Sequence, residues 1–409
     1  MNRLEPLPDC YRIIAQSDDP QKVFFHSPSV LPLPGGRLLA AAGCGHLKCS
    51  GSQEKQVGAA AACRKAEGRI FVSDDKGDAW RQTAELLFAP LCLFLSGESV
   101  YAMGQCGDLM IARSDDQGET WSAAAPLTSG QCWRQSPSNV WYANENIYIA
   151  MERAEEQKGE FAPILMRAAV GSDLLRAESW TFASALTFSD VVEREELLHY
   201  HGIPFERMED ENRSAKALTW CGGQVTQFLD PGDIWTDPSG HTFHLYLQTN
   251  SGISSMGAML KVQENPDGSM TTGVEKAPSG KTALFAAIPG AYSEFHILHD
   301  RKTGYYWLAA NQATACPEPA RTEEERRMVP DSQKNRLVLY FSKNSFDWCF
   351  AGIVSIVESG KESCSCASMA IEEDDLLIAA QYMGGHAEKG SFVSRVELYR
   401  IEQFRRYIY

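Results

Sequence analysis

Hydrophobic residues along the chain gather in short runs rich in Val, Ile, Leu, Phe and Tyr, and clusters of Gly, Pro, Asn, Asp and Ser separate these runs. This pattern is typical of β-strands joined by turns. Near the start, the runs 24–31 and 37–40 flank the turn residues Pro34, Gly35 and Gly36. Because the same pattern continues to the end of the chain, we predict an all-β fold. Further predicted strands lie at 69–72, 109–113, 140–142, 147–150, 243–247, 294–298, 305–308, 376–380 and 396–400.

Two of the predicted hairpins contain the same short motif. Residues 73–80 read SDDKGDAW and residues 114–121 read SDDQGETW, so both fit the pattern S-x-D-x-G-x-x-W. The two copies lie 41 residues apart, and each directly follows a predicted strand. This period matches one four-stranded blade of a β-propeller.

The residue types of the motif suit a tight turn. The Asp side chain can accept hydrogen bonds from backbone N–H groups of the turn, and Ser can extend this closure. Gly adopts the positive φ that the hairpin demands, and Trp buries its ring where the next strand begins. Degenerate copies lie at 171–181 and 337–348. We interpret these turns as markers of the fold that have no catalytic role.

Grouping the strands by this period predicts one domain over 1–409, a six-bladed β-propeller of four-stranded antiparallel blades. A strand near 10–16 would join the last blade and close the ring, so that no sheet edge stays open. Two charge-rich insertions, 189–216 with a short helix at 193–198 and 316–334, either wall the mouth of the central channel or are plain solvated loops. The blades are predicted at 20–88, 89–128, 129–187, 217–281, 282–358 and 359–407.

The repeated turns give the chain a family likeness, and four further segments add to it: the hairpin 34–37, the segment 147–152, the residues 335–337 and the closing segment 399–405. Along nearly its whole length it resembles the sialidase-like (BNR, or Asp-box, repeat) superfamily, as a divergent bacterial member. The resemblance implies a carbohydrate-active enzyme, an exo-acting glycoside hydrolase on an anionic sugar. Two alternatives on the same fold stay open: a uronate-type polysaccharide lyase and a non-catalytic propeller that binds a glycan or a protein.

Typical sialidases hold the substrate carboxylate with three arginines, the first in a Phe-Arg-Ile-Pro motif, because the planar guanidinium binds carboxylate in a bidentate manner. The corresponding strand here reads Phe25-His26-Ser27-Pro28, so His26 stands at the place of that arginine. No motif identifies the Tyr–Glu nucleophile pair of the family.

Polar residues at the start of the innermost strands are the candidates for catalysis, because these strands meet at one mouth of the channel. His26 is a candidate general base, Glu152 a candidate acid or base, and Tyr292 and Glu294 are expected to share one face of a strand with His296. A hydrolase needs two carboxyl groups, or Tyr with Glu. A lyase would use His26 or Tyr292 to remove a proton.

A second set of residues is predicted to bind the substrate. Arg134 would hold a carboxylate, and Trp220 would stack on a sugar ring. Structural roles are the alternatives for some of these residues: a surface ion pair for Arg134 with Glu152, and packing between blades for Trp220. His26 could equally be a structural histidine, and Tyr292, Glu294 and His296 could lie on an ordinary half-buried strand. The predicted substrate-binding residues are Arg134, Gln135, Arg153, Trp220, Gln224, His296, Arg336 and Tyr382.

The composition of the chain indicates which classes of ligand and which cellular location to expect. The net charge of -15 argues against nucleic acid and anionic membrane as ligands. No apolar run reaches the about 18 residues of a membrane span, and the start of the chain has no signal-peptide pattern. The 12 cysteines are scattered, which favours reduced thiols and a cytoplasmic location. Neither the segment 44–49 nor 364–366 has a partner pair at zinc-site spacing, and no cofactor motif is present, so we predict neither a metal nor a cofactor.

Overall fold

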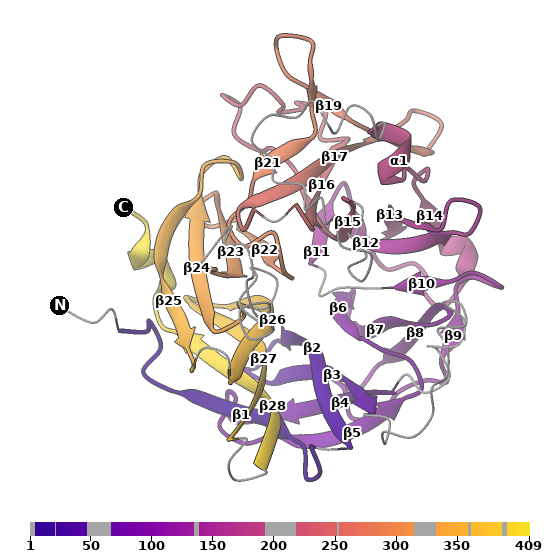
Figure 1. Cartoon of the computed structure of the whole chain (residues 1–409). Coiled ribbons are helices and arrows are strands. Elements are labelled where there is room, and N and C mark those ends of the chain that lie inside the picture. Colours follow the sequence, from indigo (N-terminus) through magenta and orange to yellow (C-terminus); the bar gives the residue numbers. More distant parts are fainter. Residues whose placement is uncertain are drawn as a thin grey trace, which may run out of the picture.

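Six antiparallel sheets surround a central axis in the computed structural model, like the blades of a propeller (Figure 1). The structure describes residues 5–20, 22–46, 67–134, 139–192, 218–251, 253–314, 333–358, 361–386 and 391–409. The prediction of an all-β propeller of six four-stranded blades is confirmed. Helical segments are short, at α1 (Phe188–Val191) and in single turns at Ala177–Ser179 and Phe404–Tyr407.

The first three blades follow the chain from the innermost strand outward. In blade 3 two short strands, β10 and β11, share the inner position because both pair with β12. Blade 1 has β2 (Val23–Pro32), β3 (Leu38–His46), β4 (Glu67–Ser73) and β5 (Arg81–Leu86). Blade 2 has β6 (Cys92–Ser96), β7 (Ser99–Cys106), β8 (Asp108–Ser114) and β9 (Ala125–Pro126). Blade 3 has β10 (Trp133–Arg134), β11 (Val140–Ala143), β12 (Asn146–Glu155), β13 (Glu160–Ala169) and β14 (Trp180–Phe182).

The last three blades continue the ring. Blade 4 has β15 (Trp220–Thr226), β16 (Thr242–Thr249), β17 (Met256–Glu264), β18 (Met270–Gly273) and β21 (Phe285–Ala287), beside the small pair β19 (Glu275–Lys276) and β20 (Thr282–Ala283). Blade 5 has β22 (His296–Asp300), β23 (Tyr305–Asn311), β24 (Arg336–Ser342) and β25 (Cys349–Ile356). Blade 6 has β26 (Glu362–Glu372), β27 (Asp375–His386), β28 (Ser391–Ile401) and β1 (Tyr11–Gln16).

The first strand of the chain lies in the last blade. Strand β1 pairs with β28 in antiparallel register, with Tyr11 opposite Tyr399. From blade 1, the Phe25 backbone N–H donates to Ser394 Oγ of β28 over 2.9 Å. Segments from the two ends of the chain therefore lie side by side, and the edge of β28 is covered.

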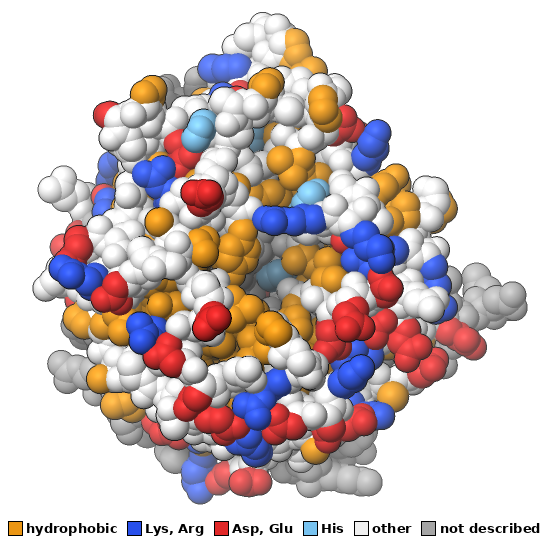
Figure 2. Space-filling view, turned by 180° about the vertical axis from the view of Figure 1, so that it is seen from behind, with side chains coloured by type: hydrophobic (Ala, Val, Ile, Leu, Met, Phe, Trp, Pro, Cys, Tyr) orange, Lys and Arg blue, Asp and Glu red, His pale blue; other side chains and the backbone are white. Residues whose placement is uncertain are grey.

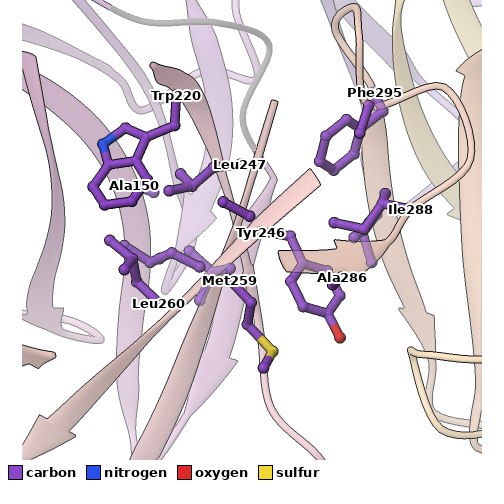
Figure 3. Close-up of a cluster of buried hydrophobic side chains, with 14 of the residues drawn as sticks. Ala150, Trp220, Tyr246, Leu247, Met259, Leu260, Ala286, Ile288 and Phe295 are labelled. Carbon is purple, nitrogen blue, oxygen red and sulfur yellow. The ribbon is translucent and has the colours of Figure 1, made fainter. Parts of the chain in front are cut away.

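The core fills the spaces between neighbouring blades. Around blade 4, Trp220, Tyr246 and Phe295 are at most 2% exposed and pack with Leu and Ile side chains of adjacent strands (Figure 3). Burying one such side chain contributes about 1.5–3 kcal/mol. From behind the view of Figure 1, the molecule is hollowed at its centre, with hydrophobic side chains around the hollow and charged ones nearer the rim (Figure 2).

The two repeat turns at 73–80 and 114–121 share one set of hydrogen bonds. In the second copy, Asp116 Oδ1 accepts from Ser114 Oγ and from the Thr120 N–H, each over 2.8 Å. Gly118 has a φ of 88° and donates its N–H to Ser114 Oγ over 2.8 Å. The Trp121 ring N–H donates to the Gly118 carbonyl over 3.3 Å. The first copy repeats this pattern from Ser73 to Trp80.

Two predictions concern loops and one concerns a strand. Most of the insertions 189–216 and 316–334, including the helix predicted at 193–198, lies outside the described residues. The strand predicted at 294–298 begins only at His296. A turn precedes it, in which the Ser293 N–H donates to the carbonyl of Gly290, whose φ is 74°. The expected alternation of Tyr292, Glu294 and His296 on one strand is therefore wrong.

None of the described helices is long and apolar enough to cross a membrane. Within the described ranges, no three or more His, Cys, Asp and Glu side chains group in a way that could hold a metal ion.

Candidate functional site

In each blade the strand that comes first in the chain is the innermost one, apart from the added edge strand β1 in blade 6. Because every blade is antiparallel and is built in this order, we call the end at which the inner strands begin the mouth of the channel. Three of these strands carry a bulge just after their first residues. The pairing register shifts after His26 in β2, after Cys221 in β15 and after Ser365 in β26. The bulged residues Ser27, Gly222 and Cys366 have positive φ values of 46°, 63° and 53°. Because a bulge changes the direction in which side chains point, the side chains at these positions do not follow the regular alternation of a strand.

An arginine–glutamate pair lies on the inner side of blade 3. Arg134 on β10 donates from Nε and Nη2 to the two carboxylate oxygens of Glu152 on β12, each over 3.0 Å. The Glu152 side chain is 2% exposed and that of Arg134 is 43% exposed. The Arg134 guanidinium also lies 3.9 Å from the centre of the Phe161 ring. The buried carboxylate thus fixes a cation that reaches solvent.

A second pair lies on blade 5. Lys334 Nζ lies 2.9 Å from Glu294 Oε2, and Ser293 Oγ donates to the same oxygen over 2.9 Å. Burial by itself would raise the pKa of Glu294, but the Lys334 charge and the hydrogen bonds outweigh it and lower the pKa to about 2. Glu294 is therefore an ionised carboxylate at neutral pH and cannot be a general acid.

Cys221 connects the two pairs. Burial, followed by the charge of Glu152, raises the pKa of its thiol to about 12, and the charges of Arg134, Glu294 and Lys334 also act on it. Cys221 lies on β15, which contacts both β12 of blade 3 and β22 of blade 5, so the two ion pairs lie on either side of this strand. We call Arg134, Glu152, Cys221, Glu294 and Lys334 the mouth cluster. A thiol with so high a pKa is not a nucleophile at neutral pH.

Tyrosine–glutamate contacts lie on blade 6, next to Lys334. The Tyr382 hydroxyl donates to Glu362 Oε1 over 2.6 Å, and the Arg395 guanidinium lies 3.9 Å from the centre of the Tyr382 ring. Burial, followed by Glu362, raises the pKa of Tyr382. The N–H of Cys364, which lies opposite Tyr382 in the ladder, donates to the Lys334 carbonyl over 2.7 Å. The Tyr382–Glu362 pair is thus a neighbour of the mouth cluster.

Deeper in blade 6 lies a second such contact. The Tyr399 hydroxyl donates to Glu397 Oε2, and Arg395 Nε donates to Glu397 Oε1 over 2.7 Å. Burial raises the pKa of Glu397 despite these bonds. At 1% and 4% exposed, Glu397 and Tyr399 are closed to a ligand.

His26 occupies the inner strand of blade 1. Its Nδ1 lies 3.3 Å from Ser27 Oγ, and its ring covers Gly43, where an added Cβ would lie 2.4 Å from His26 Cε1. Burial lowers the pKa of His26, so the imidazole is neutral at pH 7. A neutral imidazole can accept a proton.

Several predicted residues are held in structural roles. Trp220 is 1% exposed and packs edge-on against Phe188 with ring centres 5.0 Å apart, so it packs between blades and does not stack on a sugar. Gln224 is 2% exposed and accepts the Ile297 N–H over 3.2 Å. Tyr292 donates its hydroxyl to the Gln333 carbonyl over 2.6 Å. For these side chains, burial excludes contact with a ligand in this conformation.

The remaining predicted residues differ in environment. Arg153 pairs with Glu155 over 2.9 Å and lies 5.9 Å from the centre of the Trp133 ring. His296 is 4% exposed, and burial lowers its pKa to about 3. Arg336 is half-buried at the start of β24, and its Nε has no hydrogen-bond partner among the described residues. Gln135 lies outside the described residues.

Sequence reasoning missed Lys334, Cys221 and Glu362. Cys221 and Glu362 begin inner strands, so the rule that selected His26 could have selected them as well. Lys334 gave no such signal, because it ends a predicted loop, just before β24, and meets Glu294 from the segment just before β22.

Comparisons with known proteins agree with this architecture. No protein-family model matches the chain, and no curated protein matches it. Among solved structures, a protein of unknown function from Dyadobacter fermentans superposes with a TM-score of 0.56 at 10% identity, over 96% of this chain and 98% of that one. The NanB sialidase of Streptococcus pneumoniae gives a TM-score of 0.52 at 10% identity, over 96% of this chain and 70% of that one. A Hadza microbial sialidase gives 0.51 at 12% identity, over 96% and 68%. In fold, the chain is similar to the propellers of these sialidases.

Proposed function

We propose that this protein is a carbohydrate-active enzyme, an exo-acting glycoside hydrolase that binds an anionic sugar at the mouth of its channel. The observation that carries the proposal is the mouth cluster, in which Arg134 and Lys334 reach one site from blades 3 and 5. The solved sialidases that share the fold add support by analogy.

The two cations suit a sugar carboxylate. Glu152 occupies Nε and Nη2 of Arg134, which leaves the Nη1 hydrogens for a ligand. Lys334 adds a second charge beside Glu294. Glu152 and Glu294 balance these two charges, so an anion would be held here by directed N–H donors, above all those of the solvent-exposed Arg134 guanidinium.

The Tyr382–Glu362 pair supplies the nucleophile in this proposal. Glu362 takes the proton of the Tyr382 hydroxyl along their 2.6 Å hydrogen bond. The phenolate oxygen attacks the anomeric carbon while the glycosidic C–O bond breaks, and Glu362 passes the proton to the leaving oxygen. In the second step Glu362 takes a proton from the water that attacks the anomeric carbon, and it returns this proton to the Tyr382 oxygen as the bond between that oxygen and the sugar breaks. Ionised Glu294 stabilises the positive charge that develops on the sugar ring. Because Tyr382 is 8% exposed, substrate binding must open a path to its hydroxyl.

His26 favours the lyase as the second candidate. Its lowered pKa keeps the imidazole neutral, so it can remove the proton next to a uronate carboxylate, and elimination then leaves an unsaturated sugar. In this alternative Arg134 and Lys334 neutralise the carboxylate.

A screen of sialosides and uronate-capped oligosaccharides separates the candidates. New reducing ends without a change in absorbance indicate hydrolysis, and absorbance of an unsaturated product indicates elimination. We expect Tyr382→Phe to abolish hydrolysis and His26→Gln to leave it largely intact. The reverse result would favour the lyase, and silence of the wild-type protein across the panel would contradict both and favour a non-catalytic glycan-binding propeller.

A further inference from the structure

A pocket of about 350 Å³ lies on blade 4, lined by the loop between β15 and β16 and by residues of β17 and β19. The inner strand β15 begins at the mouth and ends at Thr226, so the loop that follows it lies at the opposite end of the blade. The pocket is therefore separate from the mouth cluster. Its volume falls within the range of small-ligand sites, about 300–1,000 Å³.

The pocket contains a fixed pair of opposite charges. Glu275 is 8% exposed, and its Oε2 lies 3.0 Å from His244 Nε2 and 3.5 Å from Lys261 Nζ. Its Oε1 accepts the Lys276 N–H over 2.9 Å. Burial alone would raise the pKa of Glu275, but these hydrogen bonds and charges lower it, so the carboxylate is ionised and held in place. The Lys261 side chain is 35% exposed and offers free N–H donors.

An aromatic wall stands beside this pair. Trp235 packs against Phe228 and Phe346, with ring centres 5.4 Å and 5.5 Å away, and its ring N–H donates to the Lys276 carbonyl over 2.9 Å. These contacts fix the indole. Ile234, which is 65% exposed, and Pro238 extend the apolar surface.

We propose that this pocket is a second binding site, for a neutral sugar residue. Lys261 balances the charge of Glu275, and the second carboxylate of the lining, Asp237, already accepts hydrogen bonds from its own loop. The lining therefore carries no excess of positive charge that would favour an anionic sugar. A carboxylate and an ammonium group bind hydroxyls as acceptor and donor, and an indole takes the C–H face of a sugar ring. The mouth, in contrast, presents the solvent-exposed Arg134 guanidinium, whose carboxylate partner is buried. The inference goes beyond the proposed function, because it needs no catalysis at the mouth.

Saturation-transfer NMR tests the site with the methyl glycosides of glucose, galactose, mannose and N-acetylglucosamine at millimolar concentration. We expect at least one of them to bind the wild-type protein. Lys261→Met should weaken that binding about tenfold, as expected for the loss of one charge-assisted hydrogen bond. Trp235→Ala should abolish it, with thermal unfolding as the check that the variant is folded.

Two matched variants serve as controls. Lys276→Met removes a neighbouring lysine whose ammonium group bonds Thr282, and Lys334→Ala changes the mouth; both should bind the sugar like the wild-type protein. Binding by none of the four glycosides would overturn the proposal. Binding that survives Lys261→Met but is lost in Lys334→Ala would also overturn it, by placing the sugar at the mouth. Hydrolysis or elimination of acidic substrates is a separate measurement, so either proposal can fail alone.

Discussion

At the scale of single residues, Lys334 and Glu294 make a pH-dependent contribution to stability. The pKa of Glu294 is lowered from 4.5 to about 2 in the folded protein. A lowered carboxyl pKa stabilises the fold above the unfolded value and loses this effect as the pH falls toward the folded value. We expect Lys334→Met to lower the free energy of unfolding at pH 7 by on the order of 2 kcal/mol.

Denaturant titrations at pH 7 and pH 3 check this expectation. The difference between Lys334→Met and the wild-type protein should shrink at pH 3, because this pH lies well below the unfolded pKa of 4.5 and approaches the lowered folded pKa. Lys343→Met, which removes a 71% exposed lysine paired with Asp230 over 3.3 Å, is the control and should cost little at either pH. A difference that stays constant with pH would mean that Lys334 acts only through packing.

Some residues of the site could be predicted from the sequence and others could not. Arg134 and Glu152 were candidates because each is a charged residue next to a predicted strand, and the structure pairs them. The same rule selected Glu294, although a turn and not a strand holds it. Lys334 was not predicted, because a side chain that meets a partner 40 residues away in the chain leaves no local pattern.

At the scale of elements, the repeat turns join neighbouring blades. A Cβ added at Gly118 would lie 2.5 Å from Leu39 Cδ2 of blade 1, and the φ of Gly118 is 88°. Gly118→Ala therefore creates both backbone strain and a clash, which we expect to cost about 2–4 kcal/mol. Gly97→Ala is the matched control, because Gly97 in the same blade has a φ of 62° and open space around its Cβ position.

Thermal unfolding of the two variants measures the difference. Gly97→Ala should show only the cost of the positive φ, about 1 kcal/mol. Equal decreases in stability for the two variants would show that the turn moves to make room for the added methyl group, so that the contact of Gly118 with Leu39 is not critical. The period of these turns was visible in the sequence, but the bulges at Ser27, Gly222 and Cys366 were not, because only Gly222 is a residue type that favours positive φ.

At the scale of the whole molecule, hydrogen bonds between inner strands hold the blades in a ring. Asn139 is 3% exposed, and its Nδ2 donates to the Val225 carbonyl over 2.6 Å and the Ile297 carbonyl over 3.1 Å. Its Oδ1 accepts the Val225 N–H over 2.7 Å. One side chain thus connects blades 3, 4 and 5. The sequence predicted the number of blades, but it did not show which side chains meet across the channel.

We expect Asn139→Ala to lower the free energy of unfolding by about 2–4 kcal/mol, because it leaves buried backbone groups of Val225 and Ile297 without a partner. Asn146→Ala, which removes an exposed hydrogen bond to the Asn144 carbonyl, should cost less than about 1 kcal/mol. Chemical denaturation compares the two variants. Similar decreases in the free energy of unfolding would mean that the ring does not depend on Asn139.

Closure of the ring depends on β1. Its residues cover the edge of β28, and the Arg395 guanidinium donates to the Tyr11 hydroxyl over 2.9 Å. Deletion of residues 1–16 removes β1 with its buried Ile14 and so exposes the backbone edge of β28. We therefore expect a lower unfolding temperature and association through the open edge. Size-exclusion chromatography with thermal unfolding measures both effects. Arg12→Ala, which removes an exposed ion pair with Asp78 and an exposed contact with Cys10, is the control and should behave like the wild-type protein. A truncated protein that stays monomeric with an unchanged unfolding temperature would show that blade 6 is complete without β1.

Because Arg395 also lies against Tyr382, loss of β1 should disturb the Tyr382–Glu362 pair as well, which links the closure of the ring to the site at its mouth.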